Sequence, residues 1–302
     1  MMGLSYVVKI DKFSKPVKFL LSLIELMHLV TVRLPLKLLL REKGKRFLDR
    51  IGLQTGYQTY HKLIKTFNLN EYKVVVEVDG SSFLVKPFML DVISIFDERY
   101  EKELFEKWFK PDIGWIVLDV GAYYGRHTVY ASKKVGQSGK IISIEPHPEN
   151  FKILLMNIRL NDCRNVIPLN VAVSDREKRL KLYLSKGHDS ASHSILSAKE
   201  LWSEEFPGEY VYVKSCSIDT ILDNLRISHV DIAKIDVEGA ELLALKGAEK
   251  SLDKIDRLLI EVHLPELLGK IIELLRKRGF VCKVLKLDHR REFHVYAKRK
   301  SY

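Results

Sequence analysis

The sequence predicts an α/β fold built on a mainly parallel sheet that ends in an antiparallel hairpin. From residue 115 onward, short apolar runs alternate with helical segments, and each apolar run is continuous. Continuous apolar strands between helices are typical of a parallel sheet that helices cover on both faces. The chain closes with two strand-like segments joined by a short turn, and such neighbours pair antiparallel.

Local patterns place each element of this fold. We expect a helical, basic N-terminal extension over residues 1–70 and a main domain over residues 71–302, which opens with a hairpin at 72–88. Hydrophobic periodicity predicts sheet strands at 116–120, 140–145, 166–171, 232–236 and 258–262, and final hairpin strands at 280–287 and 292–298. The helices are expected at 126–135, 148–161, 218–225, 240–253 and 265–278.

The composition is that of a globular protein. Of 302 residues, 46% are apolar and 29% charged, which excludes a disordered chain. The three cysteines lie far apart without a C-x-x-C pair, which excludes a disulfide scaffold and a cysteine-ligated zinc site. This usage suits a reducing compartment, so we expect a cytoplasmic protein.

The net charge of +11 is concentrated at the two ends of the chain. Residues 1–50 hold eleven Lys and Arg against four Asp and Glu, and residues 276–302 hold ten against two. A nucleic-acid enzyme would more often carry its excess around the catalytic cleft, so we do not expect a nucleic-acid partner. Docking on an anionic surface and simply solvated ends both explain the pattern.

Residues 17–40 form the most apolar stretch, but charged residues interrupt it too often for a membrane span. A peripheral membrane contact through residues 17–50 is one interpretation. The other, which we favour, is a helix packed on the main domain or on a second subunit, which would make a homodimer. The stretch lacks the features of a secretory signal.

The strongest local signal is the segment Ile116–Gly125, in which a buried strand carries Asp119 and runs into Gly121-x-x-x-Gly125 at the start of a helix. Glycine lets the backbone pass close beneath a ligand, and the helix start presents free N–H groups. A dinucleotide fingerprint would need glycines at positions 123 and 126, and a P-loop would need Gly-Lys-Ser/Thr, so both fail. An ordinary strand–helix turn is the alternative.

An acid closes the next strand, which ends in Glu145-Pro146. A carboxylate in this place, some twenty residues past the glycine turn, is suited to accept protons from both hydroxyls of a ribose. Together, Asp119-x-Gly121 and Glu145 indicate a nucleoside site.

Further acids and a histidine follow two later strands. Asp236, Glu238 and Glu241 come at and after the end of strand 232–236, and Glu261 and His263 end strand 258–262. Because ligands bind beyond the carboxyl ends of parallel strands, we expect these side chains at one rim. We interpret Glu241 mainly as a helix N-terminal acid and Asp236 as the functional one. His263 is either a general base or a packed, hydrogen-bonded side chain.

These segments together resemble the FkbM family of methyltransferases. The resemblance covers roughly residues 72–287 and rests on VLDVGAYYGRHT, SIEPHPENFKILLMNIRLN, NVAVSD, SIDTIL, IAKIDVEGAELLALKGA and IEVH, in that order. It implies a Rossmann-like class I methyltransferase domain that uses S-adenosylmethionine, with sugars, glycolipids or polyketides methylated on hydroxyl oxygens. One departure is Tyr123, where members usually have Asn.

The resemblance also implies roles for individual residues. The turn Asp119, Gly121, Ala122, Tyr123 and Gly125 would hold the methionine part of the cofactor, and Glu145 with Pro146 the ribose. Asn170 and Ala172 would line the adenine, and Asp236 would lie near the sulfonium. We assign no metal ligand; Asp236 with Glu238 or Glu261 permits Mg²⁺ without requiring it.

The reaction expected is an in-line displacement of methyl from the sulfonium to a hydroxyl of a small-molecule or glycan acceptor. His263, Asp236 and Glu238 are the candidate bases. His193 is the second choice, in the polar loop 186–197, which is either a substrate-facing lid or a surface loop.

Two rival functions remain open. An RNA methyltransferase fits the pI of about 9.3, but a base-amine enzyme would show Asn/Asp-Pro-Pro-aromatic where this chain has Asp236-Val237-Glu238-Gly239. A non-catalytic binding module with the same fold is the other.

Overall fold

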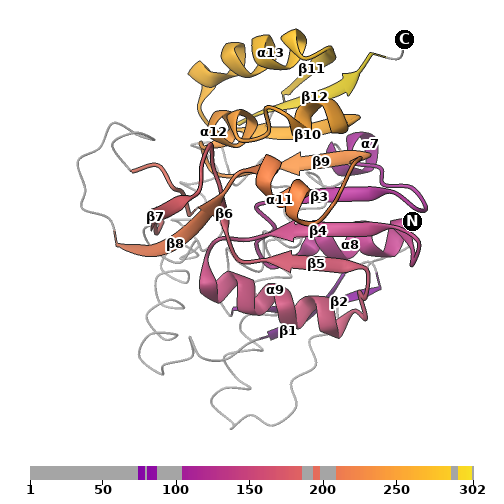
Figure 1. Cartoon of the computed structure of the whole chain (residues 1–302). Helices are drawn as coiled ribbons and strands as arrows, with labels where there is room; N and C mark the ends of the chain where they lie inside the picture. The colour runs from indigo at the N-terminus through magenta and orange to yellow at the C-terminus, as the bar shows by residue number, and fades with distance from the viewer. Residues whose placement is uncertain are drawn as a thin grey trace, which may run out of the picture.

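The computed structural model describes residues 74–78, 80–86, 104–185, 193–197, 209–286 and 292–300 (Figure 1). The predicted extension 1–70, the membrane contact over 17–50 and most of the loop 186–197 lie outside these residues and stay predictions, as does the homodimer. Within the described ranges, no helix combines the length and the apolar character needed to cross a membrane.

A seven-stranded sheet forms the centre of the fold, in the order β11-β12-β10-β9-β3-β4-β5. The five parallel strands are β3 (Ile116–Val120), β4 (Lys140–Ile144), β5 (Val166–Leu169), β9 (Ile232–Ile235) and β10 (Arg257–Val262). The antiparallel pair β11 (Phe280–Lys286) and β12 (Phe293–Arg299) completes the sheet on the β10 side. The predicted fold class is therefore confirmed, and the strand order reverses between β3 and β9.

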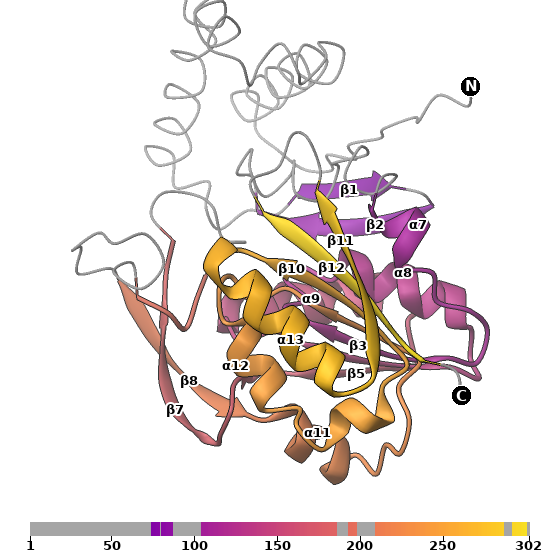
Figure 2. The same ribbon diagram turned by 90° about the horizontal axis from the view of Figure 1, so that it is seen from above.

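Helices cover both faces of this sheet (Figures 1 and 2). On one face, a core that includes Leu118 and Ile142 packs against α11 (Ile218–Asn224), α12 (Glu241–Lys246) and α13 (Leu268–Lys277). On the other, the neighbouring residues Val117 and Ile141 pack against α7 (Glu106–Trp108) and α8 (Arg126–Val135). Successive strand residues point to opposite faces of the sheet, and helices bury both faces. This explains why the strands are continuous apolar runs in the sequence.

The predicted helix over residues 240–253 is wrong in one respect, because it breaks at Gly247. A Cβ on Gly247 would lie 2.1 Å from the carbonyl oxygen of Ser174, so the backbone passes too close for any side chain. A short 3₁₀ segment, η3 (Ser251–Lys254), follows the break. The carboxylate of Asp219 accepts hydrogen bonds from the N–H groups of Lys250 (3.1 Å) and Ser251 (2.7 Å), which caps the second piece. A second 3₁₀ turn, η4 (Pro265–Leu267), precedes α13.

A second, three-stranded sheet was not predicted. The expected strand 166–171 ends at Leu169, and the chain continues into β6 (Ala172–Val173), which pairs with β8 (Tyr210–Cys216). β7 (Lys178–Tyr183) pairs antiparallel with the other side of β8. In Figure 1 the parallel strands of the main sheet point toward the side of the molecule on which β7 and β8 lie.

The predicted N-terminal hairpin is present as β1 (Val74–Val78) and β2 (Ser81–Val85), and α9 (Pro148–Leu160) holds it in place. The Asn157 amide accepts from Leu84 N (2.6 Å) and donates to Leu84 O (3.0 Å). Asn161, one helical turn later, makes the same pair of bonds with Ser82 (3.1 and 2.7 Å). The two amides thus replace a neighbouring strand along the free side of β2.

Asn157 should be important for stability because it is fully buried and also donates to Tyr124 O (2.8 Å), in the turn before α8. We expect Asn157→Ala to lower the free energy of unfolding by about 1–3 kcal/mol, since it leaves buried backbone groups without partners. Urea unfolding measures this. Met156→Ala, at a half-exposed neighbour, is the control and should stay within about 0.5 kcal/mol of the parent. Equal stabilities of the two variants would contradict this role of Asn157.

Candidate active site

The turn after β3 is tied to both neighbouring strands. The N–H groups of Gly121 and Ala122 both donate to Ile144 O in β4, at 3.0 and 2.9 Å. On the other side, Asp236 N donates to Val120 O (3.1 Å). Gly121 has φ +80°, and a Cβ there would lie 1.7 Å from Asp236 O. Only glycine fits, so the turn and the end of β9 are in direct backbone contact.

Tyr123 occupies a strained position in this turn. Its φ of +52° is in the left-handed region, which Asn tolerates far better than Tyr. This explains why Asn is the residue expected here from the family resemblance. The Tyr123 ring stacks on the Tyr124 ring with centroids 3.8 Å apart and planes at 13°, a contact that offsets part of the strain.

Glu145 lies directly beside the turn, at the end of β4. Its Oε2 accepts from Tyr123 N (2.9 Å) and its Oε1 from His147 N (2.9 Å). The side chain is 5% exposed. Burial raises its pKa to about 7, although these backbone hydrogen bonds oppose the shift. Near neutral pH this carboxyl can therefore be ionised or protonated.

Of the residues predicted to line the adenine, Asn170 lies beside Glu145 and Ala172 lies in the core of the smaller sheet. The Asn170 amide donates to the carbonyl oxygens of Glu145 (2.8 Å) and Pro146 (3.0 Å), so it positions the main chain of the expected ribose contact. Ala172 is buried in β6, where it packs with Leu182 and Val213 of the smaller sheet.

A buried lysine links the two acids nearest the turn. Lys234 Nζ lies 3.1 Å from Asp236 Oδ2, 3.8 Å from Asp119 Oδ1 and 3.3 Å from Gly121 O. Burial alone would lower the Lys234 pKa, but the two carboxylates outweigh it and raise that pKa. Thr128 Oγ1 donates to the other oxygen of Asp119 (2.6 Å). Neither Lys234 nor Thr128 was among the predicted site residues, although a lysine inside an apolar strand was a visible signal.

Four carboxylates surround His263 at the ends of β9 and β10. The Nδ1 atom is 2.9 Å from Glu241 Oε1, and Nε2 is 3.3 Å from Glu238 Oε2. Asp236 and Glu261 each place an oxygen 3.9 Å from Nε2. Burial lowers the His263 pKa, but the acids reverse the effect and hold that pKa well above its ordinary value. The imidazole is thus protonated at neutral pH and balances part of the acidic charge.

Glu241 combines the predicted helix-terminal role with a second one. Its Oε1 accepts from Gly239 N (2.8 Å), just before α12, and also faces His263 Nδ1. Glu241 is fully buried, so its carboxylate is held in place, and its contact with Nδ1 fixes the orientation of the imidazole ring. Glu238, between these groups, has a left-handed φ of +51°.

The segment 193–197 connects the two sides of the site. Ser194 Oγ donates to Glu238 O (2.6 Å). The preceding His193 places its ring 4.4 Å from that of His147, next to Glu145-Pro146. Burial, with the charges of His147 and Lys86, lowers the His193 pKa to about 3, which makes this imidazole a weak proton acceptor at pH 7.

Comparison with known proteins is consistent with this arrangement. The family model for the methyltransferase FkbM domain matches residues 119–282, more than half of the chain. The chain belongs to the FkbM methyltransferase family.

Three relatives illustrate the range of this similarity. Hexuronic acid methyltransferase AglP of Haloferax volcanii is 26% identical over 260 residues, covering 84% of this chain and 96% of that protein. Methyltransferase sdnD of Sordaria araneosa is 28% identical, covering 54% of this chain and 73% of that protein. TrmI of Methanocaldococcus jannaschii, a tRNA (adenine(57)-N(1)/adenine(58)-N(1))-methyltransferase, is 28% identical but covers only 40% of this chain and 45% of its own.

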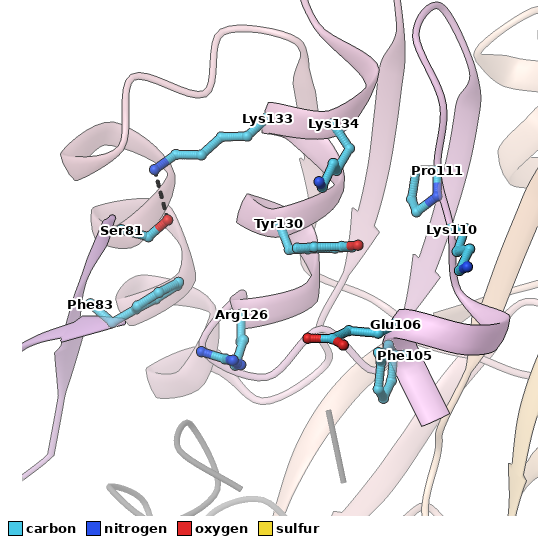
Figure 3. Close-up of a pocket in the computed structure, with 10 residues that line it drawn as sticks. All are labelled: Ser81, Phe83, Phe105, Glu106, Lys110, Pro111, Arg126, Tyr130, Lys133 and Lys134. Carbon is cyan, nitrogen blue, oxygen red and sulfur yellow. Dashed lines mark hydrogen bonds between the residues drawn. The ribbon is translucent and has the colours of Figure 1, made fainter. Parts of the chain in front are cut away.

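This FkbM methyltransferase also has a cavity of about 600 Å³ between β2, α7 and α8 (Figure 3). Figure 3 shows Tyr130 at its centre and Lys133 reaching to Ser81, with Nζ and Oγ 2.7 Å apart. Lys110, Arg126 and Lys134 add further positive charge, and Glu106 is the only acid among the described lining residues. None of the predicted cofactor or catalytic residues lines this cavity, so it is separate from the site described above.

Proposed function

We propose that this methyltransferase transfers a methyl group from S-adenosylmethionine to a hydroxyl of a sugar, a glycolipid or a related small molecule. One observation carries the proposal: Glu145 and the Asp236–Glu238–His263 cluster flank the same glycine turn, where the strand order reverses. Open α/β sheets bind ligands at such a switch point. The relative AglP, which aligns over 96% of its length, is a hexuronic acid methyltransferase, and this supports a sugar-type acceptor.

The residues around the turn fit a cofactor that carries a ribose and a positive charge. Glu145 offers carboxylate oxygens for ribose hydroxyls, while Asp119 and Asp236 exceed the charge of Lys234 by one unit. When bound, the cofactor supplies a methyl group activated by its sulfonium. The protein then mainly has to align the acceptor, and positioning of this kind contributes up to roughly 7–11 kcal/mol.

We further propose that Asp236 accepts the proton of the acceptor hydroxyl. A sugar hydroxyl stays protonated at pH 7, so it must lose its proton as the new bond forms. Protonated His263 lies 3.3 Å from Glu238 and 3.9 Å from Asp236, close enough for its positive charge to attract both carboxylates. Glu238, or His263 after losing its own proton, are the alternative acceptors.

The sharpest test follows methyl transfer from labelled S-adenosylmethionine into host extract, separated into glycan, lipid, RNA and protein. We expect label in glycan or glycolipid, and Asp236→Asn should lower kcat on that acceptor by about 10²–10⁴-fold. Asp223→Asn, at an exposed acid on α11, is the control and should keep the parental kcat. Full activity of Asp236→Asn would contradict the assignment of the base.

A divalent metal is the alternative to the protonated histidine. Ligand atoms of Asp236, Glu238 and His263 lie within 4.8 Å of one another, a set that could bind Mg²⁺ only if His263 were neutral or turned away. Because His263 already supplies a positive charge among these acids, the same assay after EDTA dialysis should give unchanged turnover. Loss of activity that Mg²⁺ restores would favour the metal.

Glu145 should make cofactor binding depend on pH. Its pKa is raised to about 7, so the carboxyl becomes increasingly protonated below pH 7 and loses its strength as an acceptor for ribose hydroxyls. We expect the affinity for S-adenosylhomocysteine to fall by up to tenfold per unit as pH drops below 7. Calorimetry from pH 5.5 to 8.5 measures this. Glu145→Gln should bind weakly with a flat profile, whereas exposed Glu149→Gln should retain the parental slope. A parental profile that is flat would count against this role.

RNA methylation is the second candidate, favoured by the match to TrmI. The acidic rim formed by Asp236, Glu238 and Glu261 opposes it, because it repels a phosphate backbone. Label in the RNA fraction of the same extract would contradict a glycan acceptor and support RNA methylation. Failure to bind S-adenosylhomocysteine would favour a non-catalytic module.

A further inference from the structure

One exposed face of the β7–β8 pair carries six consecutive cross-strand residues that are all tyrosines or cations. Three cross-strand pairs follow one another on this face: Arg179 opposite Lys214, Lys181 opposite Tyr212, and Tyr183 opposite Tyr210. We call these six residues the tyrosine–cation ladder. None of them is acidic, and Glu177 lies just beyond the far end, where it contacts Cys216 Sγ (3.8 Å).

The ladder is open to solvent. Tyr210 is 42% exposed and Tyr212 is 51% exposed, among the most exposed large apolar side chains of the described residues. The Arg179 guanidinium lies 4.5 Å above the centre of the Tyr212 ring, and Lys181 Nζ lies 4.2 Å above that of Tyr210. These contacts hold rings and cations in an alternating order on a paired, regular backbone.

Core packing does not require these side chains. The opposite face of the same two strands is apolar and buried, with Leu182 and Val213 packed on Ala172. Residues at the ladder positions could therefore be any polar type without loss of the core. Surface tyrosines combined with Arg are instead typical of a binding surface.

The near end of the ladder leads to the proposed active site. Tyr183 pairs with Ser194 through two backbone hydrogen bonds, from Tyr183 N to Ser194 O (2.7 Å) and from Ser194 N to Tyr183 O (3.1 Å). The side chain of Ser194 then donates to Glu238 O. In Figure 1 the smaller sheet lies beyond the edge of the main sheet at which β9 ends, and Figure 2 also shows β7 and β8 on the side of α12.

We propose that the tyrosine–cation ladder binds the charged part of an anionic glycan, so that an uncharged hydroxyl at its end reaches the acidic Asp236–Glu238 site. This deepens the proposed function and rests on it, because the acceptor hydroxyl would belong to that glycan. The tyrosine rings offer flat apolar surface for sugar rings, and Arg179, Lys181 and Lys214 pair with the carboxylate or phosphate groups along the chain. Three cations without an acid among the six residues select an anionic over a neutral glycan.

Calorimetry on the full chain tests the ladder with an oligogalacturonate as the probe. Its methyl-esterified form of equal length is the neutral control, and an oligouridylate of equal length is the RNA control. We expect Arg179→Gln/Lys181→Gln and Tyr212→Ala each to weaken binding of the oligogalacturonate at least tenfold. Lys270→Gln/Lys277→Gln, two cations removed from α13, should have no effect. S-adenosylhomocysteine binding and the melting temperature should be unchanged in all variants.

Several results would contradict the proposal that the ladder binds an anionic glycan. They are undetectable binding of the oligogalacturonate to the parent, equal affinity in all variants, equal binding of the esterified oligomer, or a tighter ladder-dependent complex with oligouridylate. Each of these leaves the methyltransferase proposal intact as long as the parent binds S-adenosylhomocysteine. If the parent fails to bind that nucleoside, the proposed function fails instead, which separates the two.

Discussion

The buried ammonium of Lys234 is the interaction on which the site depends. It lies between the buried Asp119 of β3 and Asp236 beyond β9, and its charge offsets the repulsion between the two carboxylates. The same group donates to Gly121 O, so one charge joins two strands and the turn between β3 and α8. Gly121 also lies in close backbone contact with Asp236, so the cofactor side and the acceptor side of the proposed site are adjacent here.

The protonated His263 imidazole links the acids on the acceptor side, as Lys234 links those beside the turn. His263 lies among four carboxylates, two of which are buried at the ends of β10 and α12. Because both systems hold more acids than cations, the region between them is negative, which suits a positively charged methyl donor. Glu145 stands apart from both clusters, held by backbone N–H groups. Burial is therefore the largest influence on the Glu145 pKa and raises it, while the backbone hydrogen bonds and the charge of Lys234 act in the opposite direction.

Much of this could be predicted from the sequence, because it depends on local patterns. Glycine spacing predicted the turn, the acid after the second strand predicted Glu145 beside it, and the polar residues that end two later strands predicted that Asp236 and His263 lie at one rim. Contacts between distant segments could not be predicted. The ion pair of Lys234 with Asp119, the bond from Ser194 to Glu238 and the approach of Gly247 to Ser174 each join residues far apart in the chain. β7 and β8 were missed for another reason: their alternating pattern was present, but it did not belong to the parallel sheet expected.

The free energy of unfolding of Lys234→Met, set against the triple variant Asp119→Asn/Lys234→Met/Asp236→Asn, tests the central claim most directly. Removing only the ammonium leaves two uncompensated acids, so the single variant should lose about 3–5 kcal/mol. The triple variant should recover a large part of that loss, because it removes the unpaired charges as well. A single variant as stable as the parent, or a triple variant no more stable than the single one, would contradict the account.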